Sequence, residues 1–325
     1  LHCSPDDIIL TLGCQEALTL CLRAVCKVGD VVAIESPTFY GQLQAIEMLG
    51  LRVLEIPSDP AEGMSLDALM LALDQMPVRA VLVTPSHNNP TGSCMSADNR
   101  RELVEILEQA QVPLIEDDVY GDLGYNSSRL PAAASFDRSG NVLYCSSLSK
   151  TLAPGYRLGW TVAGRYQNEV HKLKALTNLA SPSVLALGMA YYLMGNSYDR
   201  TLRAQRREYA RRVREMRKAI LKEFPSCDGT CGVVWVVDPH NLGLVCHFWR
   251  DGLKVWKPLV LLHQWHPVAL ASGEHGADRI NRIAGVWHKG HISWVNEAQC
   301  SVSYAFLGSY QRQHFFIWVK GYSKA

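Results

Sequence analysis

The stretch NVLYCSSLSKTLAPGYRLGW, residues 141–160, joins an apolar run to a lysine, a Pro-Gly turn and an arginine. The apolar run is typical of a buried strand, and Lys150 follows it closely, behind two serines. Arg157 comes seven residues after that lysine and carries a planar, permanently charged group suited to phosphate. A lysine that serves only solubility needs none of these neighbours. A lysine that forms a Schiff base beside a bound phosphate needs all of them.

Short apolar strands alternate with helical segments on both sides of this stretch. Strands are expected at residues 8–13, 31–37, 51–59, 80–86, 112–118 and 141–147, and helices at residues 15–26, 39–50, 65–76 and 102–110. Ser65 is a good N-cap for the third helix. This alternation predicts βαβ units and a mostly parallel sheet, which binds its ligands beyond the carboxyl ends of the strands.

Composition narrows the class of protein. The chain has 325 residues, 48% of them hydrophobic, so it can build a large core. Its formal net charge is only +1, so its overall charge does not favour binding to nucleic acid. Several of its ten cysteines lie in apolar runs, where free cysteine behaves as a small hydrophobe. Signal-peptide and membrane-span patterns are missing. We therefore expect a reduced, cytoplasmic protein without a membrane partner, and the first residue, Leu1, predicts that it is part of a longer one.

Three strand ends carry residues with two open interpretations each. Gly13, Cys14 and Gln15 lead into a helix N-terminus, where unpaired amides and the helix dipole favour an anion, although any strand-to-helix turn can contain glycine. Phe39 can lie flat on a planar ligand or cap the core. Asn89 is held extended by the following proline, so its amide can donate into the crevice; the alternative is a structural Asx-Pro turn.

Three consecutive carboxyl groups follow the strand at residues 112–118. Burying Glu116, Asp117 and Asp118 without partners would cost several kcal/mol for each charge. Since neighbouring side chains of a strand point to opposite faces, at most one or two of them face the crevice. The functional interpretation is a carboxylate that pairs with a protonated ring nitrogen, and the alternative is a metal ligand or a helix cap.

Lys150 is the candidate nucleophile of the chain. An amine is a useful nucleophile when burial or a nearby positive charge disfavours its ammonium form, and Arg157 supplies such a charge. Ser147 and Ser149 add hydroxyl donors for a phosphate. A lysine, a phosphate site and a carboxylate for a ring nitrogen together predict pyridoxal 5′-phosphate, an electron sink that proteins hold in this way.

Five segments resemble the fold type I, class I/II aminotransferases. They are TLGCQEAL (11–18), ESPTFYG (35–41), PSHNNPTG (85–92), IEDDVYG (115–121) and SLSKTLAPGYRLGW (147–160). Their details are closer to the aminotransferase-like domain of MocR-type regulators of the GntR family, and the resemblance is dense from about residue 7 to residue 224. It implies an α/β fold with a mostly parallel sheet flanked by helices, a smaller C-terminal α+β lobe, and a homodimer.

The resemblance also implies roles for individual residues. Lys150 would form the Schiff base and, in a transaminase, move the proton. Asp117 would pair with the pyridinium nitrogen, Asn89 and Tyr120 would bond the phenolic oxygen, and Phe39 would stack on the ring. The phosphate would be held by Gly13, Cys14, Gln15, Ser147, Ser149 and Arg157.

The C-terminal third departs from the family pattern. We expect a large cofactor-binding domain at residues 1–195 and a small domain at 196–325, atypical after about residue 256. CGVVWVVDP (231–239) still resembles a family strand and WRDGLKV (249–255) a family helix-turn-strand, whereas Arg279 and Arg282 lie outside the context of a carboxylate-binding arginine. Cys227, Cys231, His240, Cys246 and His247 match no strong zinc template, so we expect no metal. A frameshift or fusion and genuine divergence are the two hypotheses for this region.

Three functions follow from these patterns. The first is the effector-sensing domain of a MocR/GntR-type transcriptional regulator, which binds pyridoxal phosphate and an amino acid or amine. It would reach nucleic acid only through a DNA-binding domain outside this chain. The second is a free-standing amino-acid aminotransferase. The third is a truncated or frameshifted product without function.

Overall fold

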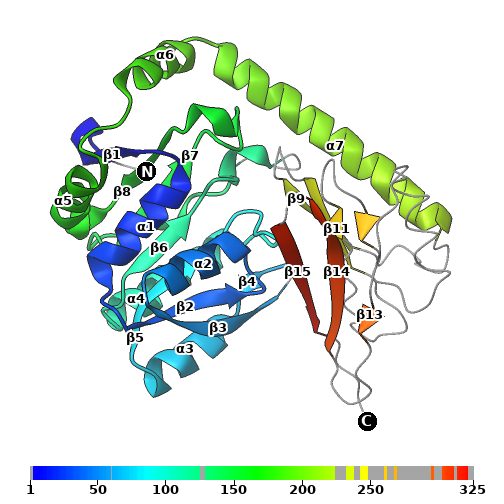
Figure 1. Ribbon diagram of the computed structural model, residues 1–325, viewed down its shortest axis with the longest axis horizontal. Helices are drawn as coiled ribbons and strands as arrows, with labels where there is room; N and C mark the ends of the chain where they lie inside the picture. Colours follow the sequence, from blue (N-terminus) through cyan, green and yellow to red (C-terminus); the bar gives the residue numbers. More distant parts are fainter. Residues whose placement is uncertain are drawn as a thin grey trace. The chain divides into compact units, whose positions relative to one another are not determined.

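The computed structural model describes residues 3–59, 61–124 and 129–223, together with the backbone of seven strands between residues 232 and 320. It divides into two compact units, residues 1–207 and residues 208–325, and each is described by itself (Figure 1). The expected domain boundary after residue 195 remains a prediction. Among the described residues, no helix is both long and apolar enough to cross a membrane.

One sheet of eight strands forms the centre of the first unit, in the order β1-β8-β7-β6-β5-β2-β3-β4. Its strands are β1 (Ile8–Thr11), β2 (Val31–Ser36), β3 (Arg52–Asp59), β4 (Gly63–Met64), β5 (Val78–Val83), β6 (Leu114–Asp117), β7 (Val142–Ser147) and β8 (Gly159–Val162). Neighbours from β7 to β3 run parallel, while β8 is antiparallel to both β7 and β1. The predicted mostly parallel sheet is confirmed.

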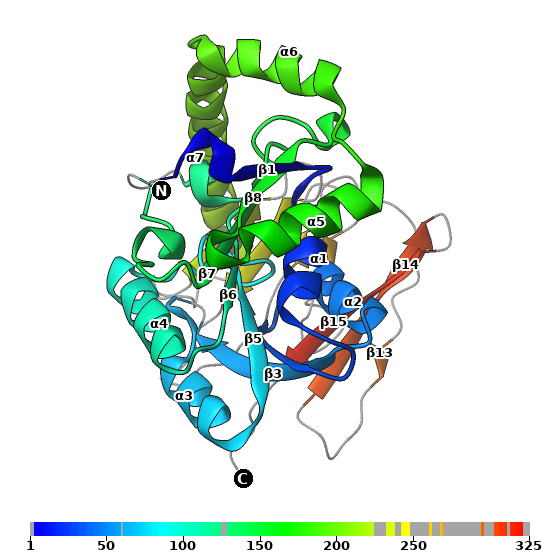
Figure 2. The same cartoon turned by 90° about the vertical axis from the view of Figure 1, so that its left-hand side faces the viewer.

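Helices cover both faces of this sheet (Figure 2). The helices are α1 (Cys14–Val25), α2 (Tyr40–Met48), α3 (Leu66–Gln75), α4 (Ala97–Gln109), α5 (Gln167–Asn178), α6 (Ser183–Met194) and α7 (Ser197–Glu223), which continues into the second unit. Helix α1 packs on α2 and α5 on one face, and α3 packs on α4 on the other. Short 3₁₀ turns occur at Pro5–Asp7, Gly121–Leu123, Ala133–Ser135, Pro154–Tyr156 and Gly164–Tyr166.

Local signals explain where the helices begin. The side chain of Ser65 accepts a hydrogen bond from the amide of Ala68, so it is the N-cap of α3 as predicted. Ser96 caps α4 in the same way, through the amide of Asn99. Beneath α3 and α4, the apolar residues of β2, β5, β6 and β7 form one buried cluster. This core fixes the strand ends that carry the candidate site residues.

The described residues of the second unit form the rest of α7 and three small antiparallel sheets. These pair β9 (Gly232–Val237) with β10 (Leu242–His247), β11 (Val260–Leu261) with β12 (Pro267–Val268), and β14 (Val302–Tyr310) with β13 (Trp294–Val295) and β15 (Gln313–Lys320). The strand predicted within residues 231–239 is present as β9. The segment 249–255, Arg279, Arg282, Cys227, Cys231 and His240 lie outside the described residues, as do the side chains of Cys246 and His247. The interpretations that depend on them remain predictions.

Candidate cofactor site

The carboxyl ends of β1, β6 and β7 lie at the same edge of the sheet. Gly159 of β8 is paired with Thr11 at the end of β1 and with Ser147 at the end of β7. The turn after β1 and the turn after β7 therefore lie on either side of one strand. The same register places Asp117, the last residue of β6, opposite Cys145 of β7.

Gly13 and Arg157 meet at the N-terminus of α1. Gly13 has a φ of +90°, and a Cβ atom there would lie 2.6 Å from Nη2 of Arg157. A Cβ atom at Gly159 would lie 2.6 Å from the carbonyl carbon of Gly13. The close approach of these two segments therefore requires glycine at both Gly13 and Gly159. Nη2 of Arg157 donates to the carbonyl of Leu12, and Nη1 donates to that of Pro154 over 3.3 Å. The guanidinium is thus fixed beside the first amides of a helix.

Ser147 ends β7, and Ser149 and Lys150 lie in the turn that follows. Ser147 and Ser149 are buried, and the amide of Ser149 donates to Oγ of Ser147 over 3.4 Å. Nζ of Lys150 lies 5.7 Å from the centre of the Tyr120 ring, which is also buried. The structure therefore brings together Lys150 and Tyr120, two residues that the sequence placed on different strand ends.

We call Gly13, Cys14, Gln15, Ser147, Ser149 and Arg157 the phosphate cradle. A guanidinium, two hydroxyls and the amides at the start of a helix are the donors that phosphate prefers. The side chain of Gln15 points elsewhere, since its Nε2 donates to the carbonyl of Gly41 over 3.1 Å. Only its backbone is therefore counted in the cradle, and the role of Gln15 at a phosphate remains a prediction.

Asp117 is buried and accepts hydrogen bonds on both carboxylate oxygens. Nε2 of Gln42 donates to Oδ2 over 2.8 Å, and the Cys14 thiol donates to Oδ1 over 3.4 Å. Burial raises the pKa of Asp117, while these two hydrogen bonds lower it. Burial and the nearby Asp117 charge together raise the pKa of the Cys14 thiol well above its usual value, so this group is a neutral donor.

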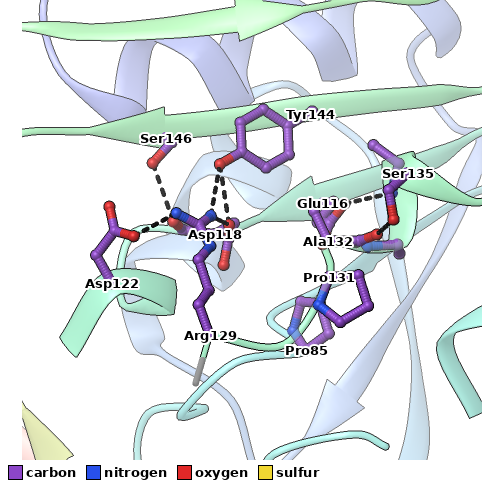
Figure 3. Close-up of polar contacts among 12 residues, drawn as sticks. Pro85, Glu116, Asp118, Asp122, Arg129, Pro131, Ala132, Ser135, Tyr144 and Ser146 are labelled. Atoms are coloured by element: carbon purple, nitrogen blue, oxygen red, sulfur yellow. Dashed lines mark hydrogen bonds and ion pairs between the residues drawn. The ribbon is translucent and has the colours of Figure 1, made fainter. Parts of the chain in front are cut away.

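The two carboxyl groups beside Asp117 have partners of their own (Figure 3). Glu116 accepts from the amides of Ala133 and Ala134 over 2.8 Å each, and burial raises its pKa to about 7. Asp118 accepts from the guanidinium of Arg129 and from the hydroxyl of Tyr144, the latter over 2.9 Å.

All three carboxyl groups of the run are buried. The expectation that burial requires partners is confirmed by the bonds of Glu116 and Asp118 and by those of Asp117. Arg129, which also pairs with Asp122, was missed by the sequence reasoning because no local pattern ties it to the strand end.

A second buried network anchors the loop that carries Asn89. Oε2 of Glu35 accepts from the amide of Thr84 over 2.7 Å and from Nδ2 of Asn88 over 2.8 Å. Oδ1 of Asn88 accepts in turn from the hydroxyl of Thr91 over 3.1 Å. Burial raises the pKa of Glu35 to about 8. The loop is thus fixed by Asn88, and Asn89 itself is half-buried.

Phe39 is half-buried at the N-cap position of α2. Its ring lies 4.7 Å from that of Tyr40, centre to centre, at an interplanar angle of 54°. The stacking role of Phe39 and the role of Asn89 at the phenolic oxygen remain predictions.

The residues present fit the predicted cofactor. The cradle supplies donors for a phosphate. Because Gly13 and Gly159 have no side chain, the backbone of the cradle can approach a phosphate closely. Asp117 is a buried carboxyl group at the end of the neighbouring strand, with donors that favour its charged form. Lys150 follows the strand between them.

Comparison with known proteins agrees with this geometry. The family model for aminotransferase class I and II matches residues 1–271. The chain is 38% identical over 248 residues to the HTH-type transcriptional regulator YjiR of Escherichia coli, covering 74% of this chain and 52% of the regulator. It is 41% identical over 223 residues to the HTH-type transcriptional regulator YdcR of the same organism, covering 69% and 48%. The chain thus spans about half the length of these curated relatives.

Among solved structures, the chain is similar to LysN, an α-aminoadipate aminotransferase of Thermus thermophilus. That structure contains N-(5′-phosphopyridoxyl)-L-leucine. The TM-score is 0.66 at 27% identity, over 76% of this chain and 63% of LysN.

Proposed function

Since the chain belongs to the class I and II aminotransferase family, whose cofactor is pyridoxal 5′-phosphate, we propose that it is the effector-sensing domain of a MocR-type transcriptional regulator. The observation that carries cofactor binding is the position of the phosphate cradle, Lys150 and Asp117 at one edge of the sheet. The regulatory role rests on the relatives YjiR and YdcR.

In this proposal each end of the cofactor would have its own partner. The phosphate cradle would hold the phosphate, and Asp117 would pair with the protonated ring nitrogen. Asn89 and Tyr120 would donate to the phenolic oxygen and Phe39 would lie against the ring, while the Lys150 amine would be the group that condenses with the aldehyde and releases water. When bound, the cofactor supplies an electron sink. An amino acid or amine is the small ligand that such a site recognises.

A free-standing amino-acid aminotransferase is the second candidate, favoured by the likeness to LysN. Lys150 would then move a proton at the substrate carbon. The two candidates share every residue of the cofactor site. They differ in whether an arginine orients the substrate carboxylate. Such orientation can lower the activation free energy by several kcal/mol. A non-functional product is the third candidate.

We further propose a cytoplasmic homodimer, with α6 in the subunit contact. This helix exposes large apolar side chains, and a surface of this kind is typical of an interface between proteins. Val184 is 81% exposed, Leu187 61%, Tyr191 75% and Met194 75%.

An absorbance titration with pyridoxal phosphate tests the cofactor site. The purified chain should develop a visible band, and borohydride should leave the cofactor covalently attached. Lys150→Ala should lose both the band and the attachment while keeping its helical circular dichroism. A chain that develops no band, or a variant that keeps it, would refute the site.

Amino acids and amines then separate the two leading candidates. A change in the band without release of a keto acid indicates effector sensing. Release of a keto acid in proportion to enzyme and time indicates a transaminase. An insoluble chain that never binds the cofactor indicates a non-functional product.

A further inference from the structure

Gln42 is a buried amide that contacts the candidate cofactor site from α2. It is 1% exposed, and its side chain makes three hydrogen bonds. Nε2 donates to Oδ2 of Asp117 over 2.8 Å and to Oγ1 of Thr84 over 3.1 Å. Oε1 accepts from Oγ1 of Thr38 over 2.8 Å. Both N–H groups and the carbonyl of this amide are therefore used, which is what a buried amide requires.

These contacts give the amide a preferred orientation. A flip of the side chain would place Oε1, an acceptor, against the carboxylate of Asp117, which is also an acceptor when ionised. The two threonine hydroxyls accept or donate as needed, so Asp117 decides which end of Gln42 faces it. Thr84 is itself fixed, because its amide donates to Oε2 of Glu35 over 2.7 Å.

The electrostatic effect of Gln42 opposes that of its surroundings. Burial raises the pKa of Asp117, and the neighbouring carboxyl group of Asp118 raises it further. The hydrogen bond from Gln42 is the largest influence that lowers it, followed by the Cys14 thiol. The carboxyl group of Glu35 also lies within electrostatic reach of Asp117. An amide donor at this point therefore favours the charged carboxylate.

We propose that Gln42 is a positioning residue that holds Asp117 charged and oriented toward the ring nitrogen of the cofactor. This inference rests on the proposed function, because it deepens the role of Asp117. The donor acts through Asp117 and is not expected to touch the cofactor. Hydrogen bonds to charged groups are strong, so losing this one should weaken cofactor binding about 10- to 100-fold.

Two substitutions separate the donor from the volume of the side chain. Gln42→Met keeps the length and removes all three hydrogen bonds, while Gln42→Glu keeps the shape and replaces the donor by an acceptor. Gln44 lies two residues along the same helix and is exposed, so Gln44→Met and Gln44→Glu are matched controls. Each variant is titrated with pyridoxal phosphate between pH 5.5 and 8.5.

Both Gln42 variants should bind the cofactor about 10- to 100-fold more weakly than the wild type at pH 8, and the Gln44 variants should bind like it. Gln42→Glu should recover affinity toward pH 5.5, because a protonated carboxyl group donates to Asp117, whereas Gln42→Met should not. Gln42 variants that bind within twofold of the wild type overturn the proposal. Equal, pH-independent losses in both variants also overturn it, since they indicate packing alone.

A donor–acceptor exchange tests the contact without the cofactor. In the Asp117→Asn, Gln42→Glu double variant the amide donates and the carboxylate accepts, so the hydrogen bond is restored with reversed polarity. The cofactor-free double variant should melt at pH 8 above Gln42→Glu, with a favourable coupling in the double-mutant cycle. It should still bind the cofactor weakly, because position 117 is no longer charged.

The double-mutant cycle tests the contact between Gln42 and Asp117, and the cofactor titration separately tests the proposed function. A cycle with no coupling refutes the contact whatever the chain binds. A coupled cycle in a wild-type chain that never binds pyridoxal phosphate refutes the proposed function, and with it the cofactor role of Gln42. Restored cofactor affinity in the double variant would show that the cofactor does not require a charge at position 117, and would overturn the proposal that Gln42 acts by holding Asp117 charged.

Discussion

Replacing Glu35 by glutamine should remove a large part of the pH dependence of stability. Burial raises the pKa of this carboxyl group from 4.5 to about 8, although Thr84 and Asn88 donate to it. In the part of the chain that the structure describes, its Oε1 is buried without a partner. The nearby charge of Asp117 raises the pKa as well. Folding therefore favours the neutral form of Glu35.

The direction and size of the change in unfolding free energy with pH follow from the difference between the pKa values of Glu35 in the folded and unfolded states. A carboxyl group whose pKa is raised by folding contributes stability that is complete below its unfolded pKa of 4.5 and is lost as the pH rises through about 8. Between pH 5 and pH 7 the wild type should lose roughly 2–3 kcal/mol of unfolding free energy through this group. Glu35→Gln does not titrate and should keep that amount.

The substitution also has a cost that does not depend on pH. The glutamine carbonyl can still accept from Thr84 and Asn88, but its amide places a new buried donor at the position of Oε1, which costs about 1–3 kcal/mol. The variant should therefore be less stable than the wild type at pH 5 and approach or exceed it at pH 7.

Urea unfolding of both cofactor-free proteins at pH 5, 6, 7 and 8 measures the difference directly. Titrating groups that do not interact with Glu35 contribute equally to both proteins and cancel in the comparison, whereas the coupling to Asp117 remains part of the measured difference. Parallel stability curves, with a constant offset across this range, would refute the assignment of a raised pKa to Glu35.

Three further outcomes are expected elsewhere in the chain. Gly13→Ala should weaken the binding of pyridoxal phosphate at least about tenfold, because the added Cβ would lie 2.6 Å from an arginine nitrogen of the cradle. The binding of unphosphorylated pyridoxal should not change. Gly29→Ala is the control for backbone strain, since Gly29 has the same φ of +90° but open space around it. Lys174→Met should cost about 3–5 kcal/mol in urea unfolding, because it leaves the largely buried Glu16, 2.8 Å away, without its ion-pair partner; a loss below 1 kcal/mol would contradict this. Leu187→Asp should turn the proposed dimer into a monomer in light scattering while the chain keeps its helical circular dichroism, and an unchanged mass would remove α6 from the proposed interface.

Much of the first unit could be predicted because its signals are local. Alternating strands and helices, the cap at Ser65 and the turn around Lys150 each depend on residues close together in the chain. The expected partners of the phosphate, Gly13 and Arg157, were also found side by side. A resemblance between motifs at strand ends predicts that such residues lie close together, because the carboxyl ends of parallel strands meet at one edge of the sheet.

The missed residues depend on contacts between distant segments. Gln42 and Asp117 are 75 positions apart, and Cys14 and Asp117 are 103 apart, so no periodicity relates them. Helical spacing predicts that Gln42 belongs to a helix, but not that its amide faces a carboxylate. Strand alternation does not predict that Glu116 and Asp118 are buried as fully as Asp117, because their burial depends on backbone amides and on Arg129 from other segments.

If the crossing of Gly13 and Arg157 holds the phosphate as proposed, the supply of vitamin B6 should affect the abundance of this protein. The cradle joins the end of the first strand to a turn 145 residues later, so it exists only after the chain has been synthesised at least to Arg157. A ligand bound there at a hundred times its dissociation constant would add about 2.7 kcal/mol to the folded state. A cell short of the vitamin would then hold less of this protein, because proteases remove the unfolded fraction.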